Sequence, residues 1–172
     1  QAGIMMTGWV TDSKDQKRYF DPSTGFMQTK WLTLKGKRYY FYSNSGVAAC
    51  KTFLTDSKKN TRYFTSACYM LTGWTKNSSN EYRYFETEDG IMAKGFQTPD
   101  GKKYYFNEKG IQQNGWQKIK GDYYFFQIRN GCYASMVTSR RVNGIYLTKS
   151  GEARYNSEEK RKLNLMVTAN QV

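Results

Sequence analysis

One pattern recurs along most of the chain and limits the structures it can form. An aromatic residue, usually preceded by glycine, recurs every 20 to 22 residues, and a short aromatic run ends ten or eleven residues after it. The first position is occupied by Trp9, Trp31, Phe53, Trp74, Phe96, Trp116 and, in a degraded copy, Met136. The runs end at Phe20, Phe41, Phe64, Phe85, Phe106, Phe126 and Leu147. A period held this closely predicts a repeat protein.

Residues 90–116, GIMAKGFQTPDGKKYYFNEKGIQQNGW, contain the clearest copy of the unit. Two aromatic runs joined by a Pro-Asp-Gly turn are typical of a β-hairpin. A single hairpin is only marginally stable in water, so each copy must pack on its neighbours. We therefore predict an all-β fold, a β-solenoid of about seven two-stranded hairpins over residues 1–155. The third copy has Ser66-Ala67-Cys68 where the others have glycine, which predicts an irregular hairpin end.

The composition favours a thin structure of short aromatic strands and not a globule with one thick core. Ile, Leu, Val and Phe together make up only about a sixth of the chain, which at a net charge of +13 is more typical of a disordered protein. The chain nevertheless has 15 Tyr and 4 Trp, and disordered chains are poor in aromatic residues. Its apolar surface is therefore concentrated in rings.

The last residues, 156–172, interrupt the pattern. Asn156 followed by Glu159 is a capping-box signature for a helix, and Leu163, Met166 and Ala169 would share one face. We expect either a helical cap on the repeat array or the start of a following domain. The opening residues, AGIMMTGW, match the end of a repeat, so we also expect the chain to come from a longer protein.

Successive side chains of a strand point to opposite faces, so a run of three aromatic residues leaves at least one ring outside. A repeated row of exposed rings favours a contact surface, although the rings could instead cover the next hairpin. The candidate aromatic residues at the tyrosine positions are Tyr19, Tyr40, Tyr63, Tyr84 and Tyr105.

The phrase Gly-Trp, turn, Tyr-Tyr-Phe, turn, Gly-x-Met resembles the cell-wall-binding repeats, of choline-binding or glucan-binding type, of bacterial surface proteins. Residues 95–111, GFQTPDGKKYYFNEKGI, are also similar to the short repeats of large clostridial toxins. The resemblance covers about residues 3–151. It implies a β-solenoid that attaches a secreted or cell-surface protein of a Gram-positive bacterium to a wall polymer or glycan.

The resemblance also implies how choline would be held, in a cage built from the Trp of Gly-Trp, a Trp opening the second run, and a Tyr of a neighbouring hairpin. The attraction is of the cation–π type. The first Trp is present at Trp9, Trp31, Trp74 and Trp116, whereas the opening position is Lys17, Arg38, Thr61, Tyr82, Lys103, Tyr123 and Gly144. A cation at that position would repel choline. The best candidate pairs are therefore Trp74 with Tyr82 and Trp116 with Tyr123.

Basic residues next to aromatic residues suggest a different ligand, an anionic wall polymer such as teichoic acid, whose sugars stack on rings while its phosphates meet cations. The candidate basic residues are Lys17, Arg38, Arg62, Arg83 and Lys103. In register they would form a basic ladder along the array. The alternative is a solvated face that keeps the sheets soluble.

Other function classes are less favoured. The chain has no His, which excludes Ser–His and Cys–His nucleophile systems and His metal sites, so we predict no catalysis, metal or cofactor here, although an attached domain could be an enzyme. A structural spacer or self-association module is the main alternative, and single-stranded nucleic-acid binding is a weaker one. No apolar run is long enough to span a membrane.

The three cysteines, Cys50, Cys68 and Cys132, are an odd number without zinc-like spacing. Cys50 and Cys68 end successive units and could approach each other. The composition favours buried, unbonded small residues.

Overall fold

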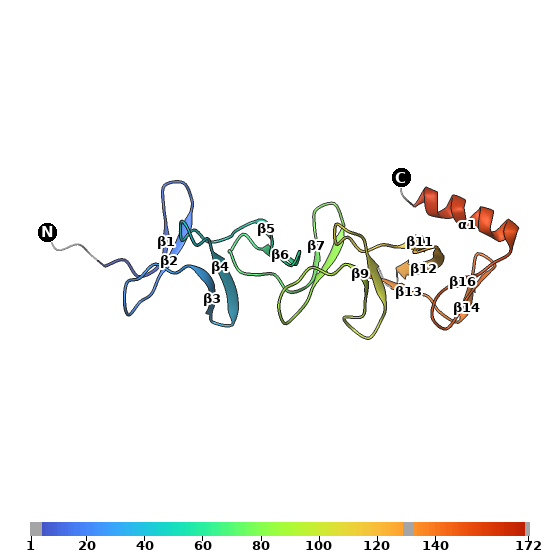
Figure 1. The fold of residues 1–172 in the computed structure, drawn as a ribbon, viewed down its shortest axis with the longest axis horizontal. Coiled ribbons are helices and arrows are strands. Elements are labelled where there is room, and N and C mark those ends of the chain that lie inside the picture. The colour runs from blue at the N-terminus through green and yellow to red at the C-terminus, as the bar shows by residue number, and fades with distance from the viewer. Residues whose placement is uncertain (1–4, 129–132, 171–172) are drawn as a thin grey trace. The chain divides into compact units, whose positions relative to one another are not determined.

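The computed structural model describes residues 5–128 and 133–170, which form sixteen short strands and one helix (Figure 1). The strands are β1 (Gly8–Thr11), β2 (Lys17–Phe20), β3 (Lys30–Leu34), β4 (Lys37–Phe41), β5 (Thr52–Thr55), β6 (Thr61–Phe64), β7 (Gly73–Lys76), β8 (Tyr82–Phe85), β9 (Gly95–Gln97), β10 (Tyr104–Phe106), β11 (Gly115–Ile119), β12 (Asp122–Ile128), β13 (Ala134–Met136), β14 (Arg140–Val142), β15 (Ile145–Leu147) and β16 (Ala153–Arg154), and the helix is α1 (Ser157–Ala169). The chain divides into unit 1 (Gln1–Gly73 with Phe85–Met92) and unit 2 (Trp74–Tyr84 with Ala93–Val172). The chain is thus all-β with a short C-terminal helix.

The first six predicted repeats each begin with an antiparallel hairpin, as the sequence pattern indicated, whereas Met136 of the seventh lies in β13, which pairs with β12. In the six regular hairpins, the first aromatic residue faces the residue just before the end of the second run. These cross-strand pairs include Trp9 with Tyr19, Trp31 with Tyr40, Phe53 with Tyr63, Phe96 with Tyr105 and Trp116 with Phe125. Paired residues lie on one face of the hairpin, so their rings can pack together.

A short return segment after each hairpin joins it to the previous one. In unit 1, the Ala48 N–H donates to the Lys17 carbonyl oxygen at 2.7 Å, and the Met70 N–H donates to the Arg38 oxygen at 2.7 Å. In unit 2, the Gln112 N–H donates to the Tyr82 oxygen at 2.8 Å. The same main-chain bond therefore recurs between consecutive hairpins within each unit.

The residue that ends each second run forms the core in all copies after the first. Phe41, Phe64, Phe85, Phe106, Phe126 and Leu147 are at most 1% exposed, which confirms this part of the predicted inner row, whereas Phe20 is only partly buried. In unit 1 the Trp9 and Trp31 rings lie 5.6 and 5.9 Å from Phe41 and Phe64, each in the following hairpin. In unit 2 the Trp74 ring lies 5.7 Å from Phe106. In these three cases a hairpin covers the core ring of the next.

The turn after β6 is regular, so the prediction of an irregular hairpin end was wrong. Cys68 has a positive φ of 65° and takes the backbone conformation that glycine has elsewhere. Its N–H donates to the Thr65 oxygen at 2.9 Å, as the Gly110 N–H donates to the Asn107 oxygen at 2.8 Å. The turn thus keeps its hydrogen bond with a side chain at this position, and that side chain has a covalent partner.

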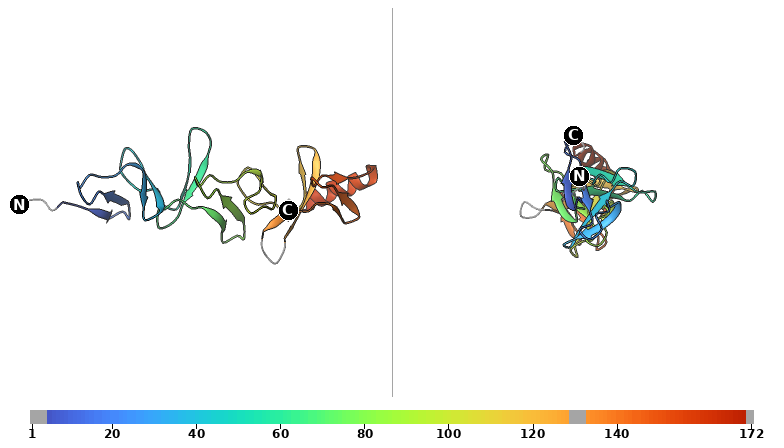
Figure 2. Two further views of the ribbon diagram at one scale, coloured as in Figure 1. Left: turned by 90° about the horizontal axis from the view of Figure 1, so that it is seen from below. Right: turned by 90° about the vertical axis from the view of Figure 1, so that its left-hand side faces the viewer.

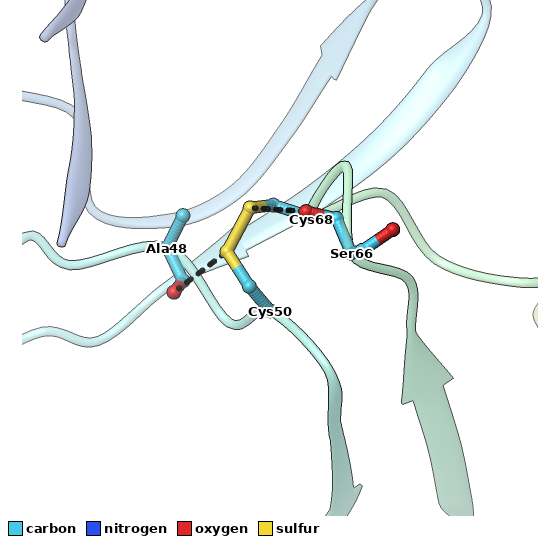
Figure 3. The surroundings of a disulfide bond; sticks show 4 residues. All are labelled: Ala48, Cys50, Ser66 and Cys68. Carbon is cyan, nitrogen blue, oxygen red and sulfur yellow. Dashed lines mark hydrogen bonds between the residues drawn. A yellow bond between two sulfur atoms is a disulfide. The ribbon is translucent and has the colours of Figure 1, made fainter. Parts of the chain in front are cut away.

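That partner is Cys50, to which Cys68 is disulfide-bonded (Figure 3). The two sulfur atoms lie 3.4 and 3.8 Å from the carbonyl oxygens of Ala48 and Ser66, respectively. Cys68 is fully buried beside Phe41 and Ala48. Our interpretation of unbonded cysteines was therefore wrong, because the turn brings the Cys68 Cα to 4.1 Å from that of Cys50. Cys132 lies outside the described residues.

Helix α1 begins as predicted, at a capping box in which the Asn156 side chain accepts from the Glu159 N–H and the Glu159 side chain accepts from the Asn156 N–H. The helix lies against β11 (Figure 2). Leu163 of the helix is fully buried. Met166 is partly buried, but Ala169 is exposed. The predicted buried face was therefore right for Leu163 and Met166 and wrong for Ala169. The helix is neither long nor apolar enough to cross a membrane.

The core beneath the helix includes Trp116, which is 3% exposed, and Tyr123, which is fully buried. The Asn170 side-chain amide donates to the Trp116 carbonyl oxygen at 3.1 Å, and the Tyr123 hydroxyl bonds to Asn164. The helix therefore covers the β11–β12 hairpin with apolar and polar contacts together.

We expect Gly46→Ala to destabilise unit 1 more than Gly36→Ala does. Both glycines have positive φ, +63° and +74°, where an L side chain costs about 1–2 kcal/mol. A Cβ at residue 46 would lie 2.3 Å from the Met27 Sδ, whereas a Cβ at residue 36 meets nothing within 4 Å. Urea unfolding followed by tryptophan fluorescence measures both variants. Equal losses of stability would contradict this packing role.

Removing the disulfide with Cys50→Ser and Cys68→Ser together is expected to lower the free energy of unfolding by about 3 kcal/mol, the order expected for a loop of this length. The bonded residues are 18 positions apart. Thiol titration of the denatured, unreduced wild-type chain should detect one thiol of the three cysteines. Finding three would refute the bond, and Cys132→Ser is the control that leaves it intact.

Trp116→Ala is expected to destabilise the chain by about 3–5 kcal/mol, since it empties a core position. Trp9→Ala should have a smaller effect, because Trp9 is 41% exposed. Thermal unfolding of the two variants, followed by circular dichroism, measures the difference. A Trp116→Ala protein as stable as Trp9→Ala would show that the helix does not depend on this ring.

Candidate functional site

Two of the tryptophans are open to solvent, and both lie in unit 1. Trp9 is 41% exposed and Trp31 is 42% exposed. Each lines a surface pocket, of about 370 Å³ at Trp9 and about 390 Å³ at Trp31. We call these the Trp9 pocket and the Trp31 pocket.

The Trp9 pocket is an aromatic corner built from two hairpins. Its lining residues are Trp9, Tyr19, Leu34, Lys35, Lys37 and Tyr39. The Trp9 ring lies 5.4 Å from Tyr19 and 5.1 Å from Tyr39, and both contacts are edge-to-face. Burial, with a smaller effect of Tyr69, raises the pKa of Tyr39, so its hydroxyl is uncharged at neutral pH. Such a corner can hold a quaternary ammonium group or the apolar face of a sugar.

The Trp31 pocket has the same frame with different chemistry. Its lining residues are Trp31, Arg38, Tyr40, Tyr42, Leu54, Thr55, Asp56, Arg62 and Phe64. Tyr40 lies 5.3 Å from the Trp31 ring, edge-to-face. The guanidinium carbons of Arg38 and Arg62 lie 4.7 and 5.8 Å from the centre of that ring. This pocket therefore already contains cations at its tryptophan.

One carboxylate balances part of that charge. Asp56 forms a 3.0 Å ion pair with Arg62. The Asn60 backbone N–H, followed by Arg62, holds the pKa of Asp56 below its usual value, so Asp56 is ionised at neutral pH. Arg62 also donates from Nε to the Asp89 carbonyl oxygen at 2.8 Å. The pocket thus has two guanidinium groups and one carboxylate.

In unit 2 the Trp74 site is filled by a side chain of the protein itself. The Tyr133 ring stacks on Trp74, with centroids 3.8 Å apart and planes 14° apart. Tyr82, the predicted partner of Trp74, contacts the same Tyr133 ring edge-on at 5.3 Å. Tyr104 forms a third side, 5.0 Å from Trp74. The predicted pair therefore shares a cluster, but Tyr133 occupies the stacking position between them.

Tyr104 in this cluster is a buried phenol with one polar partner. Its hydroxyl donates to Asp100 at 2.7 Å. Burial and this hydrogen bond raise the pKa of Tyr104 well above its usual value. The Tyr104 hydroxyl is therefore a neutral structural group at any physiological pH.

The second predicted pair, Trp116 and Tyr123, lies in the core under helix α1. The Trp116 Nε1–H donates to the Asn143 side-chain oxygen at 3.2 Å, and Tyr123 has no exposed surface. As a surface site the pair was predicted wrongly, since the helix and the β14–β15 hairpin cover both side chains. Nothing in the isolated repeat pattern indicates this cover.

The remaining predicted tyrosines are mostly used in packing. Tyr63 packs on Phe53 at 4.8 Å, and Tyr105 packs on Phe96 at 5.1 Å. Tyr84 is buried, at 6% exposure. Of the predicted aromatic residues, the two open pockets contain Trp9, Tyr19, Trp31 and Tyr40.

Sequence reasoning missed the residue that faces each tryptophan from the next hairpin. That residue is two positions before the end of the run, as in Tyr39, Arg62 and Tyr104, and not three positions before. The period-2 alternation of a strand could have identified it, because residues two apart point to the same face. The aromatic residue at the end of a run lies beneath the tryptophan of the preceding hairpin. The residue two positions before it therefore faces that tryptophan as well.

The predicted basic residues have different surroundings. Arg38 and Arg62 share the Trp31 pocket. Arg83 pairs with Glu81 at 3.2 Å, and the Lys103 ammonium lies 5.3 Å from the centre of the Phe96 ring. The Lys17 carbonyl oxygen accepts the hydrogen bond that the Ala48 N–H donates from the next hairpin's return segment. In the described ranges, no group of three or more His, Cys, Asp or Glu side chains could hold a metal ion.

Comparison with known families identifies the repeats. Residues 93–140 match the choline-binding repeat, and residues 29–48 match the putative cell wall binding repeat. The chain is 32% identical over 96 residues to glucosyltransferase-I of Streptococcus downei, covering 54% of the chain and 6% of that protein. It is 36% identical over 101 residues to glucosyltransferase-S of Streptococcus mutans, covering 58% of the chain and 7% of that protein.

Solved structures show the same hairpin repeats. CbpJ of Streptococcus pneumoniae has a TM-score of 0.75 at 28% identity, over 87% of this chain and 48% of its own. Choline binding protein F of the same organism, in the presence of a peptidoglycan analogue, has a TM-score of 0.77 at 26% identity, over 89% of this chain and 48% of its own.

The chain thus spans a small fraction of its curated relatives and about half of these solved chains. Repeats of this kind are binding modules and not catalytic domains, in agreement with the sequence-based expectation. The matched segments, residues 29–48 and 93–140, thus carry repeats of the cell-wall-binding family of choline-binding and glucan-binding type.

Proposed function

We propose that this chain is a non-catalytic module that attaches a larger surface or secreted bacterial protein to a cell-wall polymer or glycan. The observation that carries the proposal is the Trp9 pocket. There, an indole that is 41% exposed stands at the corner of three rings from two hairpins. The relatives from Streptococcus support a Gram-positive cell surface as its location.

The physical basis of binding is aromatic stacking in a pocket that is formed before the ligand arrives. The three rings are held by hairpin pairing and by Phe41 beneath them, so little ordering is needed on binding. A trimethylammonium group would gain cation–π attraction, and a sugar would gain contact with the ring faces. Weak sites of this kind bind a polymer strongly when several act together on one chain.

The proposed ligand-binding residues are those of the open pockets. They are Trp9, Tyr19 and Tyr39 in one pocket, and Trp31 and Tyr40 with the basic residues Arg38 and Arg62 in the other. The other basic residues, Lys17, Arg83 and Lys103, remain candidates for long-range attraction of an anionic polymer.

We also propose that the hairpins over residues 1–155 stack as one β-solenoid and that residues 156–172 cap its end. The repeated main-chain bonds within each unit and the burial of Trp116 under α1 support these proposals. The alternative for the helix is the first element of a following domain.

A structural spacer or self-association module is the second candidate function. It is favoured by the closed sites in unit 2, where Tyr133 fills the Trp74 site and the helix covers Trp116. In that function all rings would serve packing, and the two open pockets would bind nothing.

We expect Trp9→Ala to weaken binding at least tenfold, which is about 1.4 kcal/mol, because the variant removes the central ring of the pocket. Binding is measured by co-sedimentation with purified Gram-positive cell walls and with glucan, and by titration with choline. The matched control is Phe26→Ala, which removes a 74% exposed ring outside the pocket residues.

The control variant should bind as the wild type does. Equal effects of Trp9→Ala and Phe26→Ala would contradict the pocket. Failure of the wild-type chain to bind any wall material, glucan or choline would support the spacer instead.

A further inference from the structure

The Trp9 and Trp31 pockets share one frame and differ in the residue that faces the tryptophan from the next hairpin. In each, a tryptophan packs over the run-end Phe of the next hairpin, at 5.6 Å in one and 5.9 Å in the other. Two residues before that Phe, the first pocket has Tyr39 and the second has Arg62. The Tyr39 ring lies 5.1 Å from Trp9, and the Arg62 guanidinium carbon lies 5.8 Å from Trp31. A neutral ring has been replaced by a cation.

The Arg62 cation is a fixed wall of the pocket. Nε donates to the Asp89 carbonyl oxygen at 2.8 Å, and Nη1 pairs with Asp56 at 3.0 Å. Only 15% of the Arg62 side chain is exposed. A guanidinium group does not lose its proton in proteins, so this charge is permanent. A quaternary ammonium ligand at the tryptophan would meet a cation here, where the Trp9 pocket offers a ring. Lys35 and Lys37 also line the Trp9 pocket, but within the described residues neither forms a cation–π contact with Trp9.

Arg38 adds a second cation, which has weaker polar contacts than Arg62. Its guanidinium carbon lies 4.7 Å from the Trp31 ring centre, and its best polar contact is a long one, 3.5 Å to the Glu88 carbonyl oxygen. No carboxylate of the described residues forms an ion pair with Arg38. With Asp56 paired to Arg62, the pocket keeps one uncompensated positive charge at its aromatic surface.

The remaining walls suit a sugar ring. Trp31 is 42% exposed, and Tyr40 stands edge-on to it at 5.3 Å. Tyr42 continues this wall, 6.0 Å from Tyr40. A pocket of about 390 Å³ has room for one sugar with its substituent. Guanidinium groups bind phosphate and carboxylate oxygens through paired hydrogen bonds, and they do so better than a lysine ammonium would.

We propose that the Trp31 pocket binds an anionic sugar and excludes choline, with the sugar on Trp31 and its phosphate or carboxylate at Arg38 and Arg62. This inference rests on the proposed function and divides it between two sites. The Trp9 pocket takes a quaternary ammonium or neutral sugar group, and the Trp31 pocket takes an anionic unit of a wall polymer.

The test uses the full chain carrying Trp9→Ala, so that the Trp9 pocket does not contribute. Glucose 1-phosphate, glucuronate, glucose and choline are titrated separately, and tryptophan fluorescence and calorimetry are recorded. Either anionic sugar should bind at least tenfold more tightly than glucose, and choline should show no binding. The first two ligands distinguish phosphate from carboxylate. Equal binding of glucose and both anionic sugars, or saturable choline binding, would overturn the proposal.

Two further variants, each combined with Trp9→Ala, test whether the Arg38 and Arg62 charges bind the anionic sugar. Arg62→Tyr rebuilds the Trp9 design and should lower anionic-sugar affinity at least tenfold while introducing choline binding. Arg38→Gln removes a cation that forms no ion pair in the described residues, so it should weaken anionic-sugar binding without changing the unfolding midpoint. It thus keeps the test decisive if Arg62→Tyr folds poorly.

The matched control is Arg18→Gln. Arg18 is anchored as Arg62 is, with Nε donating to the Ser45 carbonyl oxygen at 3.0 Å and Nη1 paired with Asp12 at 2.8 Å. No cation–π contact joins it to a ring in the described residues. This variant should leave the affinity unchanged, and equal losses in Arg18→Gln and Arg38→Gln would show that only net charge matters and overturn the proposal.

The two hypotheses fail separately. If anionic-sugar binding does not depend on Arg38 or Arg62 but Trp9→Ala abolishes wall or choline binding, the proposed function stands and this inference is wrong. If the wild-type chain binds neither wall material nor any of the four small ligands, both are wrong.

Discussion

The structure depends on a ring-over-ring contact between consecutive hairpins. After the first copy, the residue that ends each second run is buried, and Phe41, for example, lies beneath Trp9 of the preceding hairpin. A two-stranded hairpin has too little surface to form a core alone, so this contact supplies the apolar burial that each hairpin lacks. The main-chain bond from each return segment to the previous hairpin fixes the register of the contact.

The same contact explains why the binding chemistry can vary without changing the fold. Once the run-end ring is fixed, the residue two positions earlier must face the preceding tryptophan. At Tyr104 that position is part of the core, but at Tyr39 and Arg62 it is only partly buried, so in unit 1 it can be a tyrosine in one hairpin and an arginine in another. The fold therefore presents a series of tryptophans whose neighbours are exchangeable, which suits a module that recognises a polymer with more than one kind of chemical group.

Tryptophans at equivalent sequence positions differ in solvent exposure because of what covers them. Trp9 and Trp31 are open, whereas Tyr133 stacks on Trp74 and helix α1 covers Trp116. Cys68 is a second example of a changed repeat position. It stands where the other turns have glycine, and it is disulfide-bonded to Cys50. Degenerate copies of a repeat are thus places where a new contact has replaced the usual one.

The sequence by itself determined the hairpins, the buried run-end row and the start of the helix at Asn156, because these depend on local turns, alternation and capping. Only the tertiary structure decided which tryptophans are open, that Cys50 and Cys68 are bonded, and that Arg62 and not the run-opening residue faces Trp31 from the next hairpin. Those features depend on how one hairpin is placed on the next. The residues that meet there, such as Trp74 and Tyr133, are far apart in the chain, and a repeat pattern does not reveal such pairs.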